Sequence, residues 1–596
     1  MKSRLGIALL VSLNVLVLGI FLFRYAGASF PMVGHDFRLF ASRLIDTHLH
    51  YKINGLGIQW YTPSFGAGLP AYANPLQAQF SLPQFLLLLL DPWNAILLSS
   101  VIYALLGYLA VFFFLKDGLG YKPISAVLGG ALFTLNGFFI ERVVVGHVNF
   151  TTFPLIAIFL LALLHPRLPT FLAAIMIALT SAALVYSGSV YIGLIALFSL
   201  LICIPLVYFL KPSLLNWRRM LPVLVYGGIL SLALCGSKLY ATSLYMANFP
   251  RVVLDEYGTN WMTATGGLIF QLVGVMSTAP FLALLGKSGM VFVARLAQWS
   301  QTPYGFWELD ASLSPILLAL LVLGAWQILK RKPIREFSWK KLSAAVFLLL
   351  AVLLAAQFSI AKGPFFHALS TFPVMESLHA NTRFTASFIL PLAILAAAAF
   401  NAWVMRQQRK SRPLLGFLLL DGLALAALWS YSLLPLDVQN RNFDMSPLME
   451  TYSLVQAGDT LPVKNIVPAM HDYEVFLYGG SNTTGHYEPL FRDDNKAFHP
   501  EVHEGSVLDL KDGYLNMTNP SGYLYPEENN TRLYERIRES ERDKLVEFIN
   551  RRQPDWKISN LQKIFDGTSG VALILVLFLM GIQLVKVKRP KAAPSA

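Results

Sequence analysis

The sequence predicts an all-α polytopic membrane protein with about 12 transmembrane helices, and three observations lead to this fold class. Hydrophobic residues make up 55% of the 596 residues and charged residues only 14%, whereas a soluble domain has about a quarter of its residues charged. Long apolar runs indicate helices, because backbone groups in hydrocarbon must pair within their own segment. The third observation is that lysine and arginine gather in alternate connections between the runs.

Twelve apolar runs are candidate spans. The first, 6–23, follows the basic residues Lys2 and Arg4 and lasts about eighteen residues, so we expect it to be retained as a span. The others are 95–115, 124–140, 152–164, 170–188, 190–210, 221–245, 312–329, 342–361, 384–404, 413–433 and 568–585. Some are shorter than the roughly 20 residues that a span needs, and we expect these to tilt or to extend into the neighbouring loops.

The basic residues give the orientation. With the N-terminus inside, every inner connection is short and basic, from Lys116 and Lys122 in the first to Lys586, Lys588, Arg589 and Lys591 in the tail. Losing one span would put a basic cluster on the wrong side, so both termini are predicted to be cytoplasmic in a multi-pass protein of the plasma (inner) membrane. The net charge of +13 is explained by these loops, and we expect no nucleic-acid partner.

The outer connections are longer and more varied than the inner ones, so function is expected on the outer face. We predict a multi-span membrane domain, 1–433, with long outer loops at 24–94 and 246–311. A composition shift to polar and acidic residues predicts a small extracytoplasmic α/β domain at 434–567, followed by the last helix and basic tail, 568–596. The apolar segment 267–297, interrupted by Lys287 and Gly289, fits two further spans or a re-entrant or interfacial hairpin, and we favour the hairpin.

The first outer loop offers a carboxylate near the membrane surface. Asp36 follows the first span by about a dozen residues, and Phe37, Phe40 and Leu44 then recur at helical spacing, which predicts an interfacial helix. That helix would hold Asp36 at headgroup level, where it could remove a proton from an acceptor hydroxyl. The alternative is that Asp36 simply caps the helix.

The stretch 59–75 is dense in aromatic residues, glycine and proline, which predicts a compact loop with a specific backbone geometry. Its aromatic faces and amide edges suit sugar binding, although Trp and Tyr also gather at any membrane interface. Trp60, Tyr61 and Asn74 are its candidate binding residues.

Short motifs continue along the spans and outer loops: Gly107 to Gly120, Asn136-Gly137-Phe138, Glu141-Arg142, Gly146-His147, Tyr186-Ser187-Gly188, Phe306-Trp307-Glu308 and Asn381-Thr382-Arg383-Phe384. Together with the first-loop acid and the stretch from Trp60 to Pro75, they resemble the YfhO-like bacterial membrane proteins. The resemblance covers most of the membrane part and, more loosely, the late outer domain. That family is similar to the GT-C glycosyltransferases, which take a sugar from a polyprenyl-phosphate at the outer face.

The resemblance implies a membrane glycosyltransferase that transfers a sugar from a polyprenyl-phosphate-linked donor to an extracytoplasmic glycan or lipid-linked acceptor. Such an enzyme needs a base, for which Asp36 is the candidate, and cations that stabilise the departing phosphate. The donor-phosphate candidates are Arg383, Arg142, Arg251 and Lys238, with Arg295 weaker. The substrate-binding candidates are His35, Arg38, Trp60, Tyr61, Asn74, His147, Trp307 and Glu308, with Asp255 and Glu256 as alternatives to Glu308.

These assignments have plainer alternatives. Arg383 could be a snorkelling residue at a span end, and Glu308 an ordinary solvated loop acid. A lone histidine such as His147 is more often structural. Lys238 lies inside a predicted span, where a charge is usually functional, but it could instead lie above the membrane if the span ends near Cys235. His35-Asp36 stands where several GT-C enzymes have paired acids, so no metal ligand is assigned, and a divalent cation (Mg or Mn) stays open as a cofactor.

Other function classes are also open. A lipid or polysaccharide transporter or flippase would have charges or broken helices at mid-membrane, and Asp421 is the clearest such charge. An O-antigen-type polymerase or ligase would share the many spans and large outer loops but would use a diphosphate-linked donor. A non-catalytic scaffold would tolerate Asp36→Asn.

Overall fold

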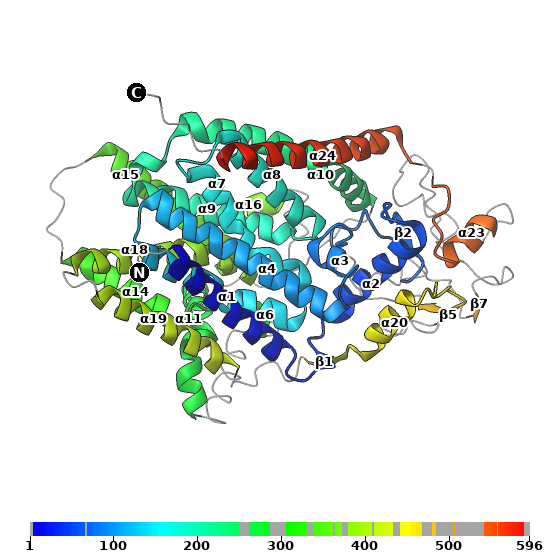
Figure 1. Cartoon of the computed structure of the whole chain (residues 1–596), viewed down its shortest axis with the longest axis horizontal. Helices are drawn as coiled ribbons and strands as arrows, with labels where there is room; N and C mark the ends of the chain where they lie inside the picture. Colours follow the sequence, from blue (N-terminus) through cyan, green and yellow to red (C-terminus); the bar gives the residue numbers. More distant parts are fainter. Residues whose placement is uncertain are drawn as a thin grey trace.

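The computed structural model describes residues 4–65, 68–248, 261–285, 306–330, 338–361, 364–371, 380–407, 411–432, 441–467, 480–483, 505–506, 542–556 and 558–588. This part of the chain is mostly helical, and many of its long helices run along one common direction, horizontal in Figure 1. The helices are α1 (Arg4–Ala26), α2 (Phe37–Asn54), α3 (Leu82–Leu86), α4 (Pro92–Phe113), α5 (Pro123–Thr134), α6 (Gly137–Val145), α7 (Ile156–Leu164), α8 (Thr170–Tyr186), α9 (Val190–Leu210), α10 (Trp217–Asn248), α11 (Trp261–Leu285), α13 (Phe306–Leu309), α14 (Pro315–Leu329), α15 (Trp339–Ala356), α16 (Pro364–Ser370), α18 (Ile389–Arg406), α19 (Ser411–Tyr431), α20 (Ser446–Gln456), α23 (Arg542–Ile549) and α24 (Asn560–Lys588).

The strands are few and short in the described residues, and they form three small sheets. They are β1 (Met32–Val33), β2 (Tyr61–Thr62), β3 (Leu69–Pro70), β4 (Phe443–Asp444), β5 (Asn465–Val467), β6 (Ser481–Thr483) and β7 (Gly505–Ser506). β1 pairs with β4 and β2 with β3, both antiparallel. The third sheet has the order β6-β5-β7 and is mixed, because β5 is parallel to β6 and antiparallel to β7.

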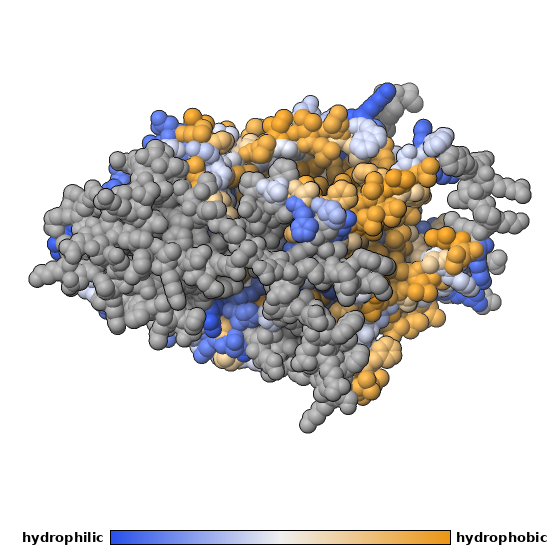
Figure 2. Space-filling view, turned by 180° about the vertical axis from the view of Figure 1, so that it is seen from behind, coloured by the Kyte–Doolittle hydropathy of each residue, from blue (hydrophilic) through white to orange (hydrophobic). Residues whose placement is uncertain are grey.

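Nine helices of the described residues are long and apolar enough to cross a membrane, and four apolar helices are shorter. Every predicted span coincides with one of these helices, and the additional one is Thr265–Leu282. The bundle also exposes large apolar side chains: Leu5, Leu9, Leu13 and Leu16 recur at spacings of four, four and three residues on one face of α1 and are each at least half exposed. Broad apolar surface on the flank of the bundle is visible in Figure 2. These features identify a multi-pass membrane protein.

The predicted span 124–140 is not one continuous helix. α5 ends at Thr134, the backbone of Asn136 is extended, and the Asn136 side chain accepts a hydrogen bond from the Phe139 N–H at 2.9 Å to cap α6. The chain turns at this point because Asn136 forms a bridge with Leu313, and the Gly137 N–H donates to the Ser312 carbonyl at 2.8 Å.

The predicted segment 267–297 begins within α11, which is also broken. Gly274 has φ +34° and ψ −152°, outside the helical region. The Met276 N–H donates to Ser312 Oγ at 3.1 Å, and the Leu313 N–H donates to the Leu272 carbonyl at 2.9 Å. The same short segment, 310–313, therefore forms hydrogen bonds with the backbone at the break in α11 and at the break between α5 and α6. Residues 286–297, the second half of the predicted hairpin, lie outside the described residues.

Loops and small elements gather at one end of the bundle, the right-hand end in Figure 1. α2, β2, α20, β5 and α23 lie there, whereas the start of α1 and the end of α24 lie toward the opposite end. α2 is the helix predicted after Asp36, but it is longer than expected and residues on both of its faces are buried. It is covered by protein because α20 packs against it.

The first outer loop and the late outer piece are joined. β1 comes from the first and β4 from the second, and Arg551 Nη1 donates to Asp46 Oδ1 on α2 at 3.1 Å. The described parts of 434–567 contain helices α20 and α23 and the sheet β6-β5-β7. The last helix begins at Asn560, earlier than the predicted boundary at residue 568.

Candidate active site

Asp36, the carboxylate predicted to be the base, precedes α2 directly. Its backbone N–H donates to the Val145 carbonyl at 3.0 Å, which holds the first outer loop against the end of α6. α6 ends at Gly146, whose φ is +99°. A Cβ at Gly146 would overlap the backbone nitrogen of Phe37, so glycine serves both the left-handed turn and the close approach of Asp36.

The side chain of Asp36 makes no capping hydrogen bond with α2. Instead, Oδ2 contacts Nε2 of His147, and Oδ1 lies 3.5 Å from Nε2 of His35. The Asp36 side chain keeps 16% of its surface exposed. This geometry does not support the interpretation of Asp36 as merely a helix cap.

The hydrogen bonds of His147 determine its tautomer. Arg142 Nη1 lies 2.8 Å from His147 Nδ1, and a guanidinium can only donate, so Nδ1 is the acceptor and carries no proton. Nε2 therefore carries the proton and donates to Asp36, which leaves His147 neutral. Burial, with the nearby Arg142 charge, lowers the pKa of His147, although the Asp36 carboxylate opposes this. Burial by itself would raise the pKa of Asp36, but the contact with His147 outweighs it and the pKa lies below its usual value.

Glu308 on α13 connects two arginines from different parts of the chain. Arg142 Nη2 donates to Oε2 at 2.9 Å, Arg383 Nε donates to the same oxygen at 2.8 Å, and Arg383 Nη2 donates to Oε1. Burial alone would raise the pKa of Glu308, but the two guanidinium groups hold that pKa well below its usual range. Glu308 is thus an ionised, buried carboxylate with two cationic partners, and not a solvated loop acid.

Aromatic rings surround both arginines. Phe150 lies under both guanidinium groups, with its ring centre 5.3 Å from Arg142 Cζ and 4.8 Å from Arg383 Cζ. Tyr191 adds a second ring at 5.0 Å from Arg383 Cζ. These cation–π contacts stabilise charge in a site that excludes water. On the other side of the site the rings of His35 and Trp307 contact each other at 4.8 Å between centroids.

This charged cluster, defined as Asp36, His147, Arg142, Glu308 and Arg383, lies at the ends of apolar helices and not at their middles. Arg383 is the third residue of the helix Asn381–Arg406, His147 directly precedes the helix Val148–Leu164, and Glu308 comes shortly before Pro315–Leu329. In the predicted topology these are the outer ends, because the other ends lead into the basic connections. The cluster therefore suits a group bound at a membrane surface.

Two other candidates, Lys238 on α10 and Trp60 in the first outer loop, lie apart from the charged cluster. Lys238 Nζ donates to the carbonyls of Tyr72, Asn74 at 2.8 Å and Gln77 at 3.3 Å. An ammonium has three N–H donors, so Lys238 is fully used in holding this loop to α10. Trp60 is buried, and its ring meets the ring of Tyr72 edge to face, with 5.4 Å between the ring centres.

The remaining candidates are placed as follows. Arg38 Cζ lies 5.8 Å from the ring centre of Phe443, near the β1–β4 pair. Asn74 is buried, and its Oδ1 accepts a hydrogen bond from the Leu76 N–H at 2.9 Å. Tyr61 lines a pocket elsewhere in the outer region. The weaker candidates Arg251, Asp255, Glu256 and Arg295 lie outside the described residues.

Three residues next to the cluster were not predicted. Tyr431 Oη contacts Glu141 Oε1 and lies 2.5 Å from Asp310 Oδ2, and all three side chains are buried. Glu141 adjoins the predicted residue Arg142, and Asp310 lies two residues after the predicted residue Glu308; this closeness in sequence was the signal that could have found them. Tyr431 lies 290 residues from Glu141 in sequence, so only the fold brings it there.

The two carboxylates of the charged cluster, Asp36 and Glu308, do not fit a divalent cation. No group of three His, Cys, Asp or Glu side chains suitable for a metal occurs among the described residues. Glu308 is already paired with two guanidinium groups, and Oδ2 of Asp36 accepts from His147. A cation would have to displace these donors, so we assign no step to a metal.

No protein-family model matches the chain, and no curated protein does; the YfhO-like resemblance is therefore not confirmed. Among solved structures, the chain is similar to the cryo-EM structure of the arabinofuranosyltransferase AftD from mycobacteria. The two chains share 15% sequence identity and superpose with a TM-score of 0.43, over 79% of this chain and 30% of the other. The chain thus spans less than a third of that protein, and its function has to be inferred from its own site.

Proposed function

We propose that this chain is a GT-C-type membrane glycosyltransferase that transfers a sugar from a polyprenyl-phosphate donor to an extracytoplasmic glycan or lipid-linked acceptor. The observation that carries the proposal is the continuous chain of contacts from Asp36 through His147, Arg142 and Glu308 to Arg383. It combines an ionised carboxylate with guanidinium groups at the ends of apolar helices. A base and a phosphate-binding cation are the two groups that this reaction requires.

Asp36 is the base in this mechanism. His147 holds Oδ2 and leaves Oδ1 to accept a proton from the acceptor hydroxyl. As that proton moves to Asp36, the acceptor oxygen forms a bond to C1 of the sugar. The bond from C1 to the phosphate oxygen breaks, and polyprenyl phosphate leaves from the opposite face. The product has an inverted configuration at C1, and the proton on Asp36 is released to solvent.

Arg383 is the residue we assign to the phosphate. Its Nε and Nη2 are bound to Glu308, while Nη1 contacts no acceptor among the described residues. The two guanidinium groups outnumber the one Glu308 carboxylate between them, and the ionised Asp36 balances the remaining positive charge until the proton transfer neutralises Asp36, which leaves Arg383 to stabilise the departing phosphate. Arg142 has no exposed surface whereas Arg383 keeps about a tenth, so Arg142 supports the site from behind. His35 and Trp307 supply an aromatic wall for the sugar.

The proposal also fixes the orientation of the chain. The donor is reached from the outer leaflet, twelve helices span the bilayer, and both termini are cytoplasmic. The basic connections at the opposite ends of the helices support this orientation.

The test in cells compares Asp36→Asn with Asp91→Asn. Asp91 is a first-loop carboxylate outside the cluster that caps α4, with Oδ1 accepting from the Asn94 N–H at 3.0 Å, and asparagine caps helices about equally well. With equal expression in membranes, we expect Asp36→Asn to remove one sugar from the cell-surface glycans and Asp91→Asn to leave them unchanged. An intact glycan profile in the Asp36→Asn strain would contradict the proposal.

A transporter or flippase is the second candidate, and one observation favours it. The breaks in α11 and between α5 and α6 meet at segment 310–313, beside the buried acids Glu141 and Asp310. Broken helices with charged groups are typical of transporters. Asp421 on α19, 3.2 Å from Asn14 Nδ2 on α1, is a further buried acid. A transporter would lose substrate movement in Asp310→Asn or Asp421→Asn and keep it in Asp36→Asn, the reverse of the pattern expected for the transferase.

A further inference from the structure

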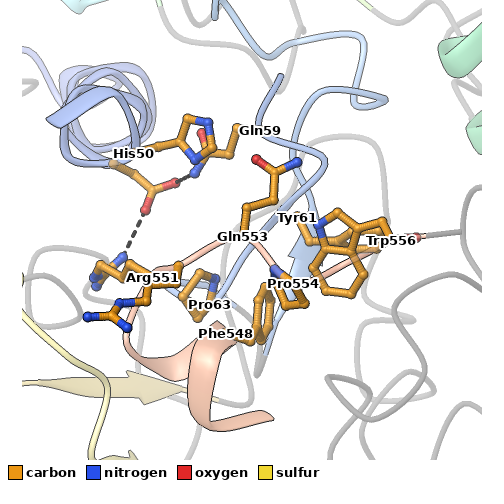
Figure 3. A pocket seen from close by; sticks show the side chains of 11 residues that line it. His50, Gln59, Tyr61, Pro63, Phe548, Arg551, Gln553, Pro554 and Trp556 are labelled. Carbon is orange, nitrogen blue, oxygen red and sulfur yellow. Dashed lines mark hydrogen bonds and ion pairs between the residues drawn. The ribbon is translucent and has the colours of Figure 1, made fainter. Parts of the chain in front are cut away.

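A pocket in the outer region lies between the first outer loop and residues 548–556, away from the charged cluster. Tyr61 and Asp46 line it from the first loop and α2, and Phe548, Arg551, Gln553 and Trp556 line it from the late outer piece (Figure 3). We propose that this pocket binds a sugar residue of the acceptor glycan. Its role as an acceptor site rests on the proposed transferase function, whereas the binding of a sugar does not.

The aromatic side of the pocket is a cluster of three rings. The ring centre of Trp556 lies 5.0 Å from that of Tyr61, and 5.7 Å from that of Phe548, which it meets edge to face. The three side chains are almost fully buried and belong to one apolar cluster. Packed rings of this kind hold the pocket rigid, and the 9% of Trp556 that stays exposed is the largest apolar contact that the three rings leave for a sugar.

Arg551 provides a hydrogen-bond donor that the protein leaves unused. Its Nε donates to the Leu461 carbonyl at 2.8 Å, and its Nη1 donates to Asp46 Oδ1 at 3.1 Å and to Ser64 Oγ at 2.5 Å. Nη2 has no hydrogen-bond partner, and it is buried, because only 5% of the surface of Arg551 is exposed. An unsatisfied buried donor that lines a pocket points to a ligand acceptor.

The backbone at Arg551 supports the same conclusion. Its φ is +61°, in the left-handed region that residues other than glycine and asparagine seldom adopt. The surrounding contacts keep this conformation: the Arg551 carbonyl accepts from Asn54 Nδ2 at 2.8 Å, and the Gln553 N–H donates to Asn54 Oδ1 at 3.0 Å. Such strain persists where the structure enforces it and is concentrated at binding sites.

The charged lining residues are Asp46, Arg551 and the exposed Arg552, so the pocket carries one positive charge in excess and is rich in hydrogen-bond donors for a polyhydroxyl ligand. The Asp46 carboxylate is matched by Arg551 and also accepts from Gln59 Nε2 at 2.8 Å. His50 uses both ring nitrogens, with Gly57 O at 3.1 Å and Asn54 Nδ2 at 3.1 Å. The side-chain amide of Gln553 extends toward Gln59 and His50 across the pocket (Figure 3). An amide and two guanidinium groups provide donors that match the hydroxyl groups of a sugar.

α2 relates the pocket to Asp36. Asp36 precedes the first residue of α2, and Asp46, which lines the pocket, is ten residues further along. At 1.5 Å per residue the two positions are about 15 Å apart along the helix axis. An extended oligosaccharide can bridge this separation, with one sugar in the pocket and its growing end at Asp36. The pocket is therefore suited to an inner sugar of the acceptor chain.

Binding is measured with the full-length protein in nanodiscs and a panel of fluorescent linear tetrasaccharides of glucose, mannose, galactose, rhamnose and arabinofuranose. We expect at least one to bind, and Trp556→Leu to weaken that binding about tenfold or more. Gln553→Ala, a half-exposed position less critical for folding, is expected to weaken it severalfold. Glu547→Gln, on the exposed face of α23, and Asp36→Asn are the controls and should bind as the unaltered protein does.

Two results would overturn the inference: no tetrasaccharide binds, or Trp556→Leu and Gln553→Ala both bind normally. These outcomes are distinct from failure of the transferase. If a tetrasaccharide binds but Asp36→Asn leaves the cell-surface glycans intact, the sugar site stands and the transferase fails. If Asp36→Asn removes a sugar but nothing in the panel binds, the transferase stands and the sugar site fails.

Discussion

The chemistry at the residue scale depends on a neutral histidine. Arg142 can only donate, and this fixes the proton of His147 on Nε2, where it holds Asp36. In the proposed mechanism His147 is thus a positioning residue that orients Asp36 without contacting the sugar. The same contacts keep Asp36 ionised, because a donor directed at a carboxylate favours its charged form.

The pH dependence follows from this tautomer. Protonation of His147 would add a proton at Nδ1, toward the Arg142 N–H, and would break that hydrogen bond. Since burial lowers the pKa of His147 below its usual 6.5, its contribution to stability is fully present above pH 6.5. That contribution is lost as the pH falls through the lowered value. We expect sugar transfer to be constant above pH 6.5 and to decline on acidification, in a pH profile of initial rates.

His147→Gln separates this role from a merely structural one. Glutamine keeps a donor for Asp36 but cannot titrate, so the acid limb should shift to lower pH, where Asp36 itself becomes protonated. We expect kcat to fall by up to about 100-fold through misplacement of the base, with little change in the KM for donor. An acid limb identical to that of the unaltered protein would contradict the role assigned to His147.

The position of Asp36 in the sequence made it the candidate base, but it did not reveal the side chains that hold this carboxylate. The acid was chosen because it follows the first span closely, and it does lie at the ends of the helices. His147 was interpreted as a lone histidine because its partner is 111 positions earlier in the chain, from Asp36 to His147. Glu308 and Arg383 were likewise separate candidates, since no periodicity links side chains that only helix packing brings together.

At the element scale, two interrupted helical regions and one short segment support the candidate site. Segment 310–313 bonds to both breaks, and Glu308 lies just before it. Hydropathy predicted 124–140 as one span because its apolar character continues through the break. Asn136-Gly137 was nevertheless visible in the sequence and is a helix start. The break at Gly274 has no such marker, because it depends on contacts with Ser312 and Leu313.

Gly137→Ala tests this arrangement. A Cβ at Gly137 would overlap Asp310 Oδ1 and Ser312 Oγ, so segment 310–313, which closely follows Glu308, must shift. Overpacking of this kind costs about 1–3 kcal/mol, and we expect a lower unfolding temperature in detergent together with a loss of transfer.

The matched control is Gly422→Ala on α19, where no atom lies within 4 Å of the added methyl group. There alanine is expected to be neutral or to stabilise by about 0.5–1 kcal/mol through helix propensity. Equal unfolding temperatures for Gly137→Ala and Gly422→Ala would show that the segment does not depend on the glycine.

At the scale of the whole molecule, hydropathy located the helices well, but the way the outer parts pack could not be predicted. The late piece is predicted to be a small α/β domain. Its described parts pair with the first outer loop through β1–β4, α20 and Arg551. Composition marks the piece as polar and outside the membrane, whereas its docking depends on single contacts such as Asp46 with Arg551.

The orientation can be tested by labelling single cysteines with a membrane-impermeant maleimide. Cys203 and Cys235 are buried, so background labelling should be low. We expect Asp543→Cys, exposed on α23, to react in intact cells, and Lys341→Cys, exposed at the start of α15, to react only after lysis. Labelling of both positions in intact cells, or the reverse pattern, would contradict an outer location of the site.

The central claim is that Asp36 removes the acceptor proton while a polyprenyl phosphate leaves. Its most direct test uses full-length protein in liposomes with a radiolabelled sugar on polyprenyl phosphate and a cell-envelope glycan fraction as acceptor, and measures the initial rate of sugar transfer. We predict that the unaltered protein transfers the label and that Asp36→Asn binds the donor equally but transfers about 100- to 10,000-fold more slowly, as expected for loss of a general base. An Asp36→Asn protein that transfers the sugar at the unaltered rate would contradict the mechanism.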